Sequence, residues 1–530
     1  MNDQTDTSPE TPAVGPRGVR VSEETQPPQL ATRTAELLTR GYRLALVAAH
    51  EDDDSFRIVY LFTAAQPDRR TELVVRTSLE NPSVPTLARI SFPAGRFERE
   101  MRDMYGIVPL DHPLPHRMVR HQHWPRGWYP MRSDAGDPPP FGSTDEPYPF
   151  VTVKGRGVYE IPVGPVHAGI IEPGHFRLSV VGETVLKLKA RLWFAHKGIE
   201  KLVEGRSVAQ AYPVAERISG DTTVGHSLAF CLAVEQALDW QVTAREGLLR
   251  AMLLEMERLY NHVTDIGALC GDAGHGVLNA LALTVREQLL QLNAAVTGHR
   301  LLRGAITPGG AAVLSLPAVA QIRAVALEVA DIVELALGNT LVHDRFASTA
   351  VLRAGQVQDL GALGCAARAS GVDRDARRDH PFHAATTTVA AVVETGGDVL
   401  ARFLVRAGEV KASADLLAEL LTQLGEEALE TATTHQPLDH PTGQPTGQRP
   451  PRQPPLPATQ VSGVGLVEGW RGTIAHRVEI RADGTLARLK IVDPSFFNWP
   501  AVPVAMKDTI VPDFPLVNKS FNLSYAGNDL

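Results

Sequence analysis

The sequence predicts an α+β protein with a small N-terminal α/β domain and a large, mainly helical domain with peripheral β hairpins. Three observations support this prediction. Strand-like apolar runs follow a helical segment within the first 110 residues, and long stretches beyond residue 220 repeat apolar residues at helical spacing. The 530 residues, 44% hydrophobic and 21% charged, suit a globular chain with a large core. We expect a disordered tail over 1–28, the α/β domain over 29–110, an extended linker over 111–150 and the large domain over 151–530, with a Pro-rich insertion over 435–460.

Local composition supports each N-terminal segment. Residues 1–28 are rich in Thr, Pro, Glu and Gln, which favours disorder. The α/β domain is predicted to contain a helix over 29–40, strands over 42–49, 56–62 and 72–78, and a second helix over 85–90 or the stretch beyond it. Residues 111–150 are rich in Pro, His, Arg and Trp, which is typical of a linker that wraps over a neighbouring surface.

The large domain shows two kinds of pattern. In 244–265, apolar residues recur at helical spacing and predict a buried helix face. Further helices are predicted over 227–242, 278–301, 316–337, 387–410 and 416–434. Strand hairpins are predicted over 176–192, turning at Gly182–Glu183, and over 475–491, turning at residues 482–484. The insertion over 435–460 contains eight prolines, which predicts a low-complexity, polyproline-like segment.

A dense, mixed-charge run over 97–107 ends at Gly106–Ile107. By charge alone it predicts the start of an exposed, salt-bridged helix. The same string resembles the Glu-Arg-Glu-x-x-Asp-Met-Phe/Tyr-Gly-Ile motif of the small hydrophilic subunit of respiratory complex I. The resemblance implies that residues 29–110 have that subunit's fold.

Two later segments resemble the metal-binding signatures of the large subunit of nickel–iron hydrogenases. Residues 215–227 match Glu-Arg-x-Cys-Gly-x-Cys-x-x-x-His, and residues 493–498 match Asp-Pro-Cys-x-x-Cys. The four thiol positions hold Ser219, Thr222, Ser495 and Asn498. Such a site needs soft thiolates, which hydroxyls and an amide cannot replace. We therefore expect no metal site.

The cysteine count supports the same expectation. Only Cys231, Cys270 and Cys365 exist, with no paired spacing, and three thiols cannot build a four-thiolate site. Each lies in an apolar stretch and is expected to be a small buried hydrophobic residue. So few cysteines also fit a reducing compartment.

Three candidate functional positions follow from the resemblance to the hydrogenase large subunit and its relative, the quinone-site subunit of complex I. The Gly164–Pro165–His167 turn matches their Gly-Pro-x-His turn and implies a candidate quinone site. Glu200 matches a motif along a route to the protein exterior and is either a proton relay or an ion-pair partner within the fold. His226 matches the histidine beyond the first thiol pair and is either functional or a core or cap residue.

One departure and one open alternative accompany these positions. The tyrosine of the quinone site is missing at Gly220 or its neighbour. The loop with Asp373, Asp375, Arg377 and Arg378 resembles a family loop; its charges form either a buried ion-pair network or a solvated surface.

Several function classes are excluded or disfavoured. A net charge of −8 gives no support for nucleic-acid binding, and no apolar run reaches the ~18–20 residues that span a bilayer. We find no signal segment, phosphate-binding loop, dinucleotide fingerprint or Gly-x-Ser-x-Gly nucleophile turn. The chain is therefore expected to bind no cofactor directly, quinone excepted as a candidate.

The fusion of two complex I-like units resembles the large subunit of group 4, formate-hydrogenlyase-like and hydrogenase-4-like assemblies. The resemblance implies a subunit of a complex I-related oxidoreductase, peripheral on the cytoplasmic face of the cell membrane. Its expected partners are a small subunit carrying an iron–sulfur cluster and antiporter-like membrane subunits. Electron transfer, with quinone as a candidate acceptor, would be coupled to ion translocation without nickel–iron chemistry. The alternative is a non-catalytic scaffold that docks the same partners.

Overall fold

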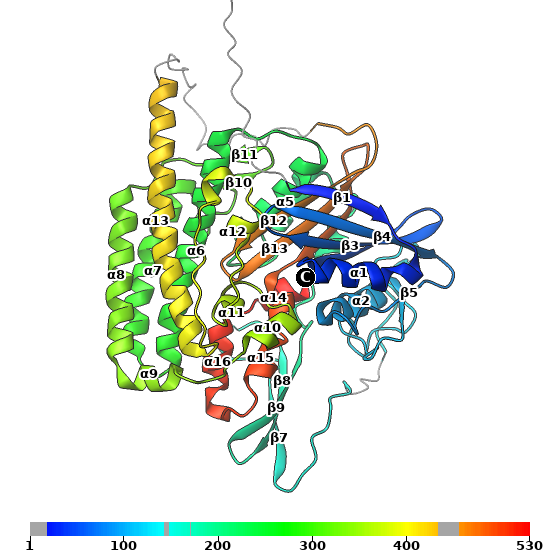
Figure 1. The fold of residues 1–530 in the computed structure, drawn as a ribbon, viewed down its shortest axis with the longest axis horizontal. Coiled ribbons are helices and arrows are strands. Elements are labelled where there is room, and N and C mark those ends of the chain that lie inside the picture. The colour runs from blue at the N-terminus through cyan, green and yellow to red at the C-terminus, as the bar shows by residue number, and fades with distance from the viewer. Residues whose placement is uncertain (1–17, 143–147, 170, 433–454) are drawn as a thin grey trace, which may run out of the picture.

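The computed structural model describes residues 18–142, 148–169, 171–432 and 455–530. Figure 1 shows an N-terminal α/β part (blue) beside a body of long helices, with a C-terminal sheet (orange) between them. The C-terminal sheet packs on helix α5 (Thr223–Ala237) on one side and contacts strand β2 (Arg43–Glu51) of the N-terminal sheet on the other. The predicted α+β class and the two-part organisation are confirmed.

The N-terminal sheet has the order β1-β4-β3-β2. Strands β3 (Ser55–Ala64) and β4 (Arg69–Ser78) continue the predicted meander, and α1 (Leu30–Thr39) is the predicted first helix. The predicted tail is wrong in part, because Val19–Glu24 form β1, parallel to β4. This polar strand is held by ladder hydrogen bonds and by Arg20, which donates to the Ser462 carbonyl at 2.7 Å; composition cannot show such contacts. Residues 1–17 lie outside the described part.

The second helix lies beyond residues 85–90. Helix α2 runs Phe92–Tyr105, begins after the Ser91 cap and ends at Gly106, whose φ of +78° favours glycine. Residues Ser83–Pro85 instead form β5, which pairs in parallel with β6 (Val108–Leu110).

The charged run on α2 is not an exposed face, so that prediction is wrong. Glu98 is buried and accepts hydrogen bonds from the Leu87 amide at 2.5 Å and the Thr86 hydroxyl at 2.6 Å. Asp103 is also buried and accepts from the amides of residues 118, 119 and 120. These carboxylates satisfy backbone donors of neighbouring loops, and Asp103 thereby ties the 111–142 segment to the domain. That segment forms no helix or strand in its described residues.

A pH-dependent stability difference is expected for Glu98→Gln. Burial raises the pKa of Glu98 to about 7, against the opposing hydrogen bonds from Thr86 and Leu87. Between about pH 4.3 and 7 the native state keeps a proton that the unfolded chain has released. The wild-type protein should therefore lose stability relative to the variant as pH rises through this window, by up to about 1.4 kcal/mol per pH unit. Urea unfolding of both proteins from pH 4.5 to 8 checks this; a constant difference would contradict it.

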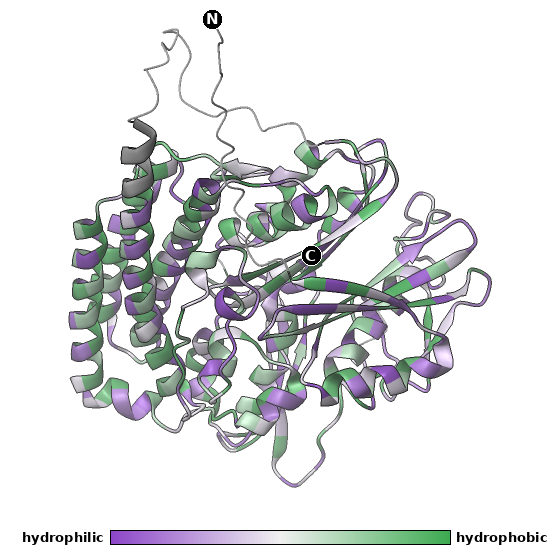
Figure 2. Cartoon of the chain, turned by 45° about the horizontal axis from the view of Figure 1, so that its top comes forward, coloured by the Kyte–Doolittle hydropathy of each residue, from purple (hydrophilic) through white to green (hydrophobic). Residues whose placement is uncertain are grey.

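Long helices form the body. The following run antiparallel or obliquely beside one another: α6 (Ala244–Asp272), α7 (Gly276–Thr297), α8 (Val319–Gly338) and α13 (Val399–Ala432). Helix α6 packs between α7 and α13 and is buried along most of its length, as its apolar spacing predicts. Among the described residues no helix has both the length and the apolar character needed to cross a bilayer. In Figure 2 each long helix carries hydrophilic as well as hydrophobic residues.

The two helices predicted over 387–410 and 416–434 are one. Helix α13 begins only at Val399, because Gly397 (φ +68°) precedes it and Asp398 accepts a hydrogen bond from the Ala401 amide at 2.8 Å. It continues without a break past Lys411, whose ammonium pairs with Asp415 one turn on. Residues 387–398 contain no helix.

Two three-stranded sheets belong to the large part. Strands β7 (Val158–Val163), β8 (His175–Val181) and β9 (Thr184–Arg191) include the first predicted hairpin and project from the body in Figure 1. Strands β13 (Gly472–Ile480) and β14 (Leu486–Val492) are the second hairpin, and β12 (Val461–Gly469) adds a strand that we did not predict.

The β12–β14 sheet is internal rather than peripheral. Every residue of β13 is buried. The sheet packs closely against α5: a Cβ on Gly465 of β12 would lie 1.9 Å from the Ala229 carbonyl oxygen of that helix. Glycine at this position lets the strand backbone approach the helix backbone directly.

Short helices complete the structure: α3 (Ile199–Leu202), α4 (Val208–Ala215), α9 (Thr340–Phe346), α10 (Ala354–Leu360), α11 (Gly364–Arg368), α12 (Ala376–Asp379), α14 (Pro494–Asn498), α15 (Ala501–Ala505), α16 (Phe514–Phe521) and α17 (Tyr525–Asp529). Small two-residue strands β10 (Ile306–Thr307) and β11 (Gly310–Ala311) pair beside α6. Of the predicted insertion, residues 435–454 lie outside the described part.

Candidate functional site

The four positions that match thiol ligands lie just before α5 and within the short helix α14. Ser219 and Thr222 precede α5, while Ser495 and Asn498 belong to α14, and all four are buried. The Ser219 hydroxyl lies 2.8 Å from the Ser524 hydroxyl, and the Ser524 amide donates to the Ser495 hydroxyl at 2.9 Å. Two of the four positions are therefore joined through a third serine that sequence reasoning missed.

Thr222 is linked to Ser219 through Asp221, which accepts from both hydroxyls at 3.0 Å and also pairs with Arg471. The Arg471 guanidinium donates to both carboxylate oxygens of Asp221 at 2.7 Å and to the Thr222 hydroxyl at 3.2 Å. It also lies over the Trp470 ring, 3.8 Å from the ring centroid. Burial would raise the pKa of Asp221, but Arg471 lowers it to about 2, so the pair is ionic at neutral pH.

Asn498 points to a different neighbour. Its side-chain oxygen accepts from the Leu363 amide at 2.7 Å, and its nitrogen donates to the Leu363 carbonyl at 3.1 Å. Three of the four positions thus belong to one hydrogen-bond network that includes the Arg471 guanidinium, whereas Asn498 bonds to the Leu363 backbone. Oxygen and amide groups bonded in this way do not fit nickel and iron, which need thiolates. In the described part of the chain no three His, Cys, Asp or Glu side chains are arranged to hold a metal ion.

His226 lies behind these positions and is fully buried. One ring nitrogen is 3.0 Å from an Asp493 carboxylate oxygen and the other is 3.1 Å from His476 Nε2. Asp493 also caps α14 by accepting from the Ser495 amide at 2.7 Å. Burial, together with His226, holds the pKa of His476 well below its usual range. Sequence spacing gave no signal for His476, which comes from β13.

Glu200 takes part in buried ion pairs. It accepts from Arg488 at 2.7 Å and from the Ile491 amide at 3.0 Å, and Lys490 lies at 3.1 Å. Burial would raise its pKa, but Arg488 and Lys490 lower it to about 2. Lys490 also pairs with Glu100 of α2, so this cluster joins the two parts of the protein.

His167 lies apart from the other two, in the loop between β7 and β8. Gly164 has φ of +80°, and a Cβ there would lie 2.2 Å from the Gly174 carbonyl, so the turn requires glycine. The half-exposed His167 ring places Nε2 2.8 Å from the same carbonyl, and its centroid is 6.2 Å from that of Phe176. Pro165 accepts from the Gly174 amide at 3.1 Å. The turn is therefore preorganised, and its histidine is held against its own loop.

The charged segment 373–378, which leads into α12, contains both a buried ion-pair network and a surface ion pair. Arg377 and Asp375 are buried in an ion-pair network, whereas Arg378 and Asp373 pair at 2.9 Å near the surface. At the centre of the network lies Glu409 of α13, which sequence reasoning missed.

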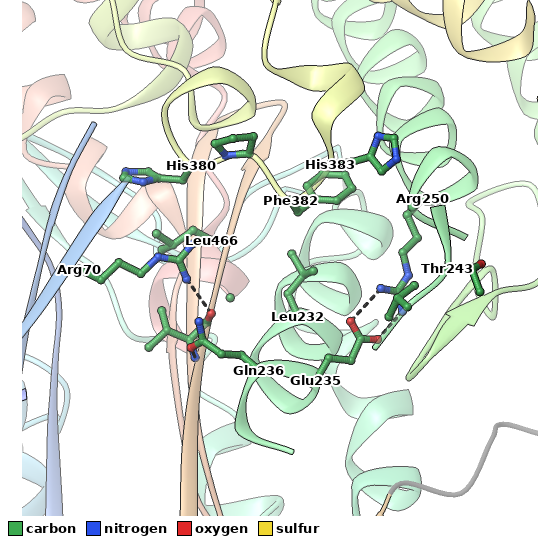
Figure 3. A pocket seen from close by; sticks show the side chains of 15 residues that line it. Arg70, Leu232, Glu235, Gln236, Thr243, Arg250, His380, Phe382, His383 and Leu466 are labelled. Carbon is green, nitrogen blue, oxygen red and sulfur yellow. Dashed lines mark hydrogen bonds and ion pairs between the residues drawn. The ribbon is translucent and has the colours of Figure 1, made fainter. Parts of the chain in front are cut away.

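A pocket shown in Figure 3 lies between α5, α6, β12 and residues 380–383. Glu235 forms two hydrogen bonds with Arg250, at 2.9 and 2.5 Å. His380 contacts Asp68 at 2.8 Å, and Arg70 donates to the Val464 carbonyl at 3.0 Å. The charged side chains of this pocket are thus bonded to one another or to the backbone, and they connect the elements that surround it.

Family models match three consecutive parts of the chain. Residues 24–138 match the 30 Kd subunit of respiratory-chain NADH dehydrogenase, and residues 272–529 match its 49 Kd subunit. Residues 197–271, which hold Ser219 and Thr222, match the nickel-dependent hydrogenase family.

Relatives match over most of the chain. It is 30% identical over 484 residues to formate hydrogenlyase subunit 5 of Escherichia coli K12, covering 89% of this chain and 81% of that protein. It is 30% identical over 444 residues to hydrogenase-4 component G of the same organism, covering 82% of this chain and 73% of that protein. A chain of the archaeal membrane-bound sulfane sulfur reductase, described as a respiratory membrane complex, shares the fold with a TM-score of 0.59 and 23% identity, covering 71% of this chain and 99% of that chain.

Proposed function

Because the chain belongs to the family of complex I-related hydrogenase large subunits, with 30 kDa-type and 49 kDa-type units fused in one chain, we propose that it takes part in electron transfer within a membrane-associated respiratory complex, without nickel–iron chemistry. The observation that carries this proposal is the Arg471 guanidinium, which is bonded to Asp221 and Thr222 where a hydrogenase would hold its first thiol pair.

The proposed partners follow from the family. An iron–sulfur cluster in a neighbouring small subunit would supply electrons, and antiporter-like membrane subunits would move ions. The chain would lie on the cytoplasmic face of the membrane and be attached through these partners. The respiratory membrane complex named for the structural relative supports this placement.

The Gly164–Pro165–His167 turn is the proposed quinone contact. His167 Nε2 now lies against the Gly174 carbonyl, and a small ring rotation would let it donate a hydrogen bond to a quinone oxygen instead. The Phe176 ring beside it offers an apolar neighbour for the quinone ring. The Glu200 carboxylate, held ionised by Arg488 and Lys490, would hold the two parts of the chain together in this role.

The second candidate function is a non-catalytic scaffold. It is favoured by the absence of a tyrosine at Gly220 and by the mutual hydrogen bonding of Ser219, Ser495 and Ser524. On this alternative the fold is kept only to dock the neighbouring subunits.

Metal analysis and electron paramagnetic resonance on the complex purified through this chain test the proposal. We expect iron–sulfur signals without nickel, and we expect the reduced clusters to be reoxidised by added short-chain ubiquinone. His167→Ala should slow this reoxidation at least tenfold, whereas His343→Ala, on an exposed part of α9, should not. One equivalent of nickel would contradict the proposal, and a complex without any metal signal would favour the scaffold.

A further inference from the structure

A cavity of about 270 Å³ lies where α2, residues 112–118, the end of β9 and residues 499–503 meet. Its walls combine aromatic rings with arginine side chains, including Trp193, Trp499, Tyr148, Arg96 and Arg191. None of the residues discussed above as candidate electron-transfer positions lines it. Its volume approaches that of small-molecule sites, which place a few polar groups among apolar walls.

Arg191 lines this cavity and is only 4% exposed. Its guanidinium donates to the carbonyls of Met118 and Arg120, and it lies over the Tyr148 ring, 4.7 Å from the centroid. These partners are neutral, and no carboxylate of the described residues forms an ion pair with it. Burial is the main cause that lowers its pKa to about 10, which indicates an under-compensated cation.

Arg96 faces the same cavity from α2. Its Nε atom is buried and has no hydrogen-bond partner among the described residues, and Nη2 makes one long contact of 3.4 Å to Asn528. Its guanidinium lies 4.6 Å from the centroid of the Phe496 ring. The carboxylates nearest to it are already bonded: Glu100 pairs with Lys490, and Asp529 accepts from the Ala195 amide at 2.9 Å. Burial, followed by the adjacent Arg99, lowers the pKa of Arg96 to about 9.

Most other buried arginines of this fold have carboxylate partners. Arg377, Arg477 and Arg488 each form ion pairs shorter than 3 Å. Arg120 and Arg402 have none among the described residues, but Arg120 donates to the carbonyls of residues 125 and 128, and Arg402 donates to Ser520 and to the carbonyls of residues 350 and 397. Neither lines the cavities described above. Burying a cation without a counter-ion is costly, so the buried Arg191 and the half-buried Arg96, facing one cavity without a carboxylate partner among the described residues, indicate an anionic ligand.

The walls define the rest of the ligand. Trp193 and Trp499 contribute flat apolar surfaces, and Pro500 and Pro503 close one side with rigid apolar rings. Aromatic walls of this kind favour a flat, apolar body. We propose that this cavity binds a small aromatic carboxylate, with its ring between the tryptophans and its carboxylate between Arg96 and Arg191.

Isothermal titration calorimetry of the full chain with 2-naphthoate tests this proposal. We expect saturable binding at one site, with at least tenfold weaker binding of the neutral analogue 2-naphthamide, because only the carboxylate can accept charge-assisted hydrogen bonds. Arg96→Gln should weaken naphthoate binding at least tenfold, and Arg96→Lys should restore part of it. Arg323→Gln, which removes an exposed arginine on α8, is the matched control and should change nothing.

Three outcomes would overturn the proposal. Equal affinity for naphthoate and naphthamide would show that charge plays no part. Unchanged binding to the Arg96→Gln variant would place the ligand elsewhere. Binding to the isolated chain but not to the assembled complex would show that a side chain of a neighbouring subunit fills the cavity. Since the test measures neither metal nor electron transfer, its failure leaves the proposed function unaffected.

Discussion

Replacing Glu409 by glutamine should lower the free energy of unfolding by about 3–5 kcal/mol, the range observed when one partner of a buried ion pair is removed. Glu409 is fully buried on α13. Its carboxylate pairs with Arg258, with Arg377 at 3.0 Å and with Arg368 at 3.1 Å. Glutamine keeps the shape but removes the negative charge between three guanidinium groups. Burial would raise the pKa of Glu409, but Arg377 and its neighbours hold it well below the usual range, so the charge is present at pH 7.

Urea unfolding at pH 7, followed by circular dichroism, measures this effect. Glu287→Gln is the matched control, because Glu287 pairs with Arg300 at 2.5 Å on an exposed face of α7. Solvent screens such a pair, so its loss should cost far less than the loss of the Glu409 charge. If both variants lost the same small amount, the Glu409 network would contribute no more than a surface ion pair.

Gly364→Ala should lower the free energy of unfolding by about 3 kcal/mol. Gly364 has φ of +60°, a conformation that costs an alanine roughly 1 kcal/mol or more. In addition, a Cβ there would lie 2.1 Å from the Arg471 carbonyl oxygen and 2.4 Å from the Gly472 Cα, and backbone atoms cannot move aside cheaply. Since this backbone carries Arg471, the substitution should also weaken the Arg471–Asp221 pair.

Gly41→Ala separates the two contributions. Gly41 has φ of +82°, but nothing lies within 4 Å of a Cβ built on it. This variant should show the conformational cost alone, roughly 1 kcal/mol. Thermal or urea unfolding of the two variants side by side gives the difference. Equal losses of stability would mean that the backbone at residues 471–472 moves away from the new methyl group at little cost.

Much of the fold could be predicted because the relevant patterns are local. Apolar spacing placed α6, and strand-like runs between turn residues placed β2, β3 and β4. Predictions failed where a distant segment decides the outcome. By charge alone, Glu98 and Asp103 of α2 are expected at the surface. Both are buried, because residues 86–87 and 118–120 donate hydrogen bonds that satisfy their carboxylates. Strand β12 was missed because its glycines matter only once α5 packs on it.

The candidate site shows the same division. Order along the chain identified Ser219, Thr222, Ser495 and Asn498 as one set, since motif matching depends on spacing alone. It did not identify Ser524, Arg471 or His476, which come from segments without a distinctive pattern. It also grouped His167 with Glu200 and His226, whereas the structure places His167 on a projecting loop and the other two in buried networks.

By itself, the sequence determined the fold class, the order of the two units and the replacement of four thiolates by oxygen and amide groups, because residue types and their periods are properties of the chain. Only the tertiary structure decided which charges are compensated. It pairs Arg471 with Asp221 and surrounds Glu409 with three arginines, and it leaves Arg96 and Arg191 in one cavity without a carboxylate among the described residues. The physical reason is that the energy of a buried charge depends on groups within a few ångströms in space, and these come from segments as far as 250 residues apart along the chain.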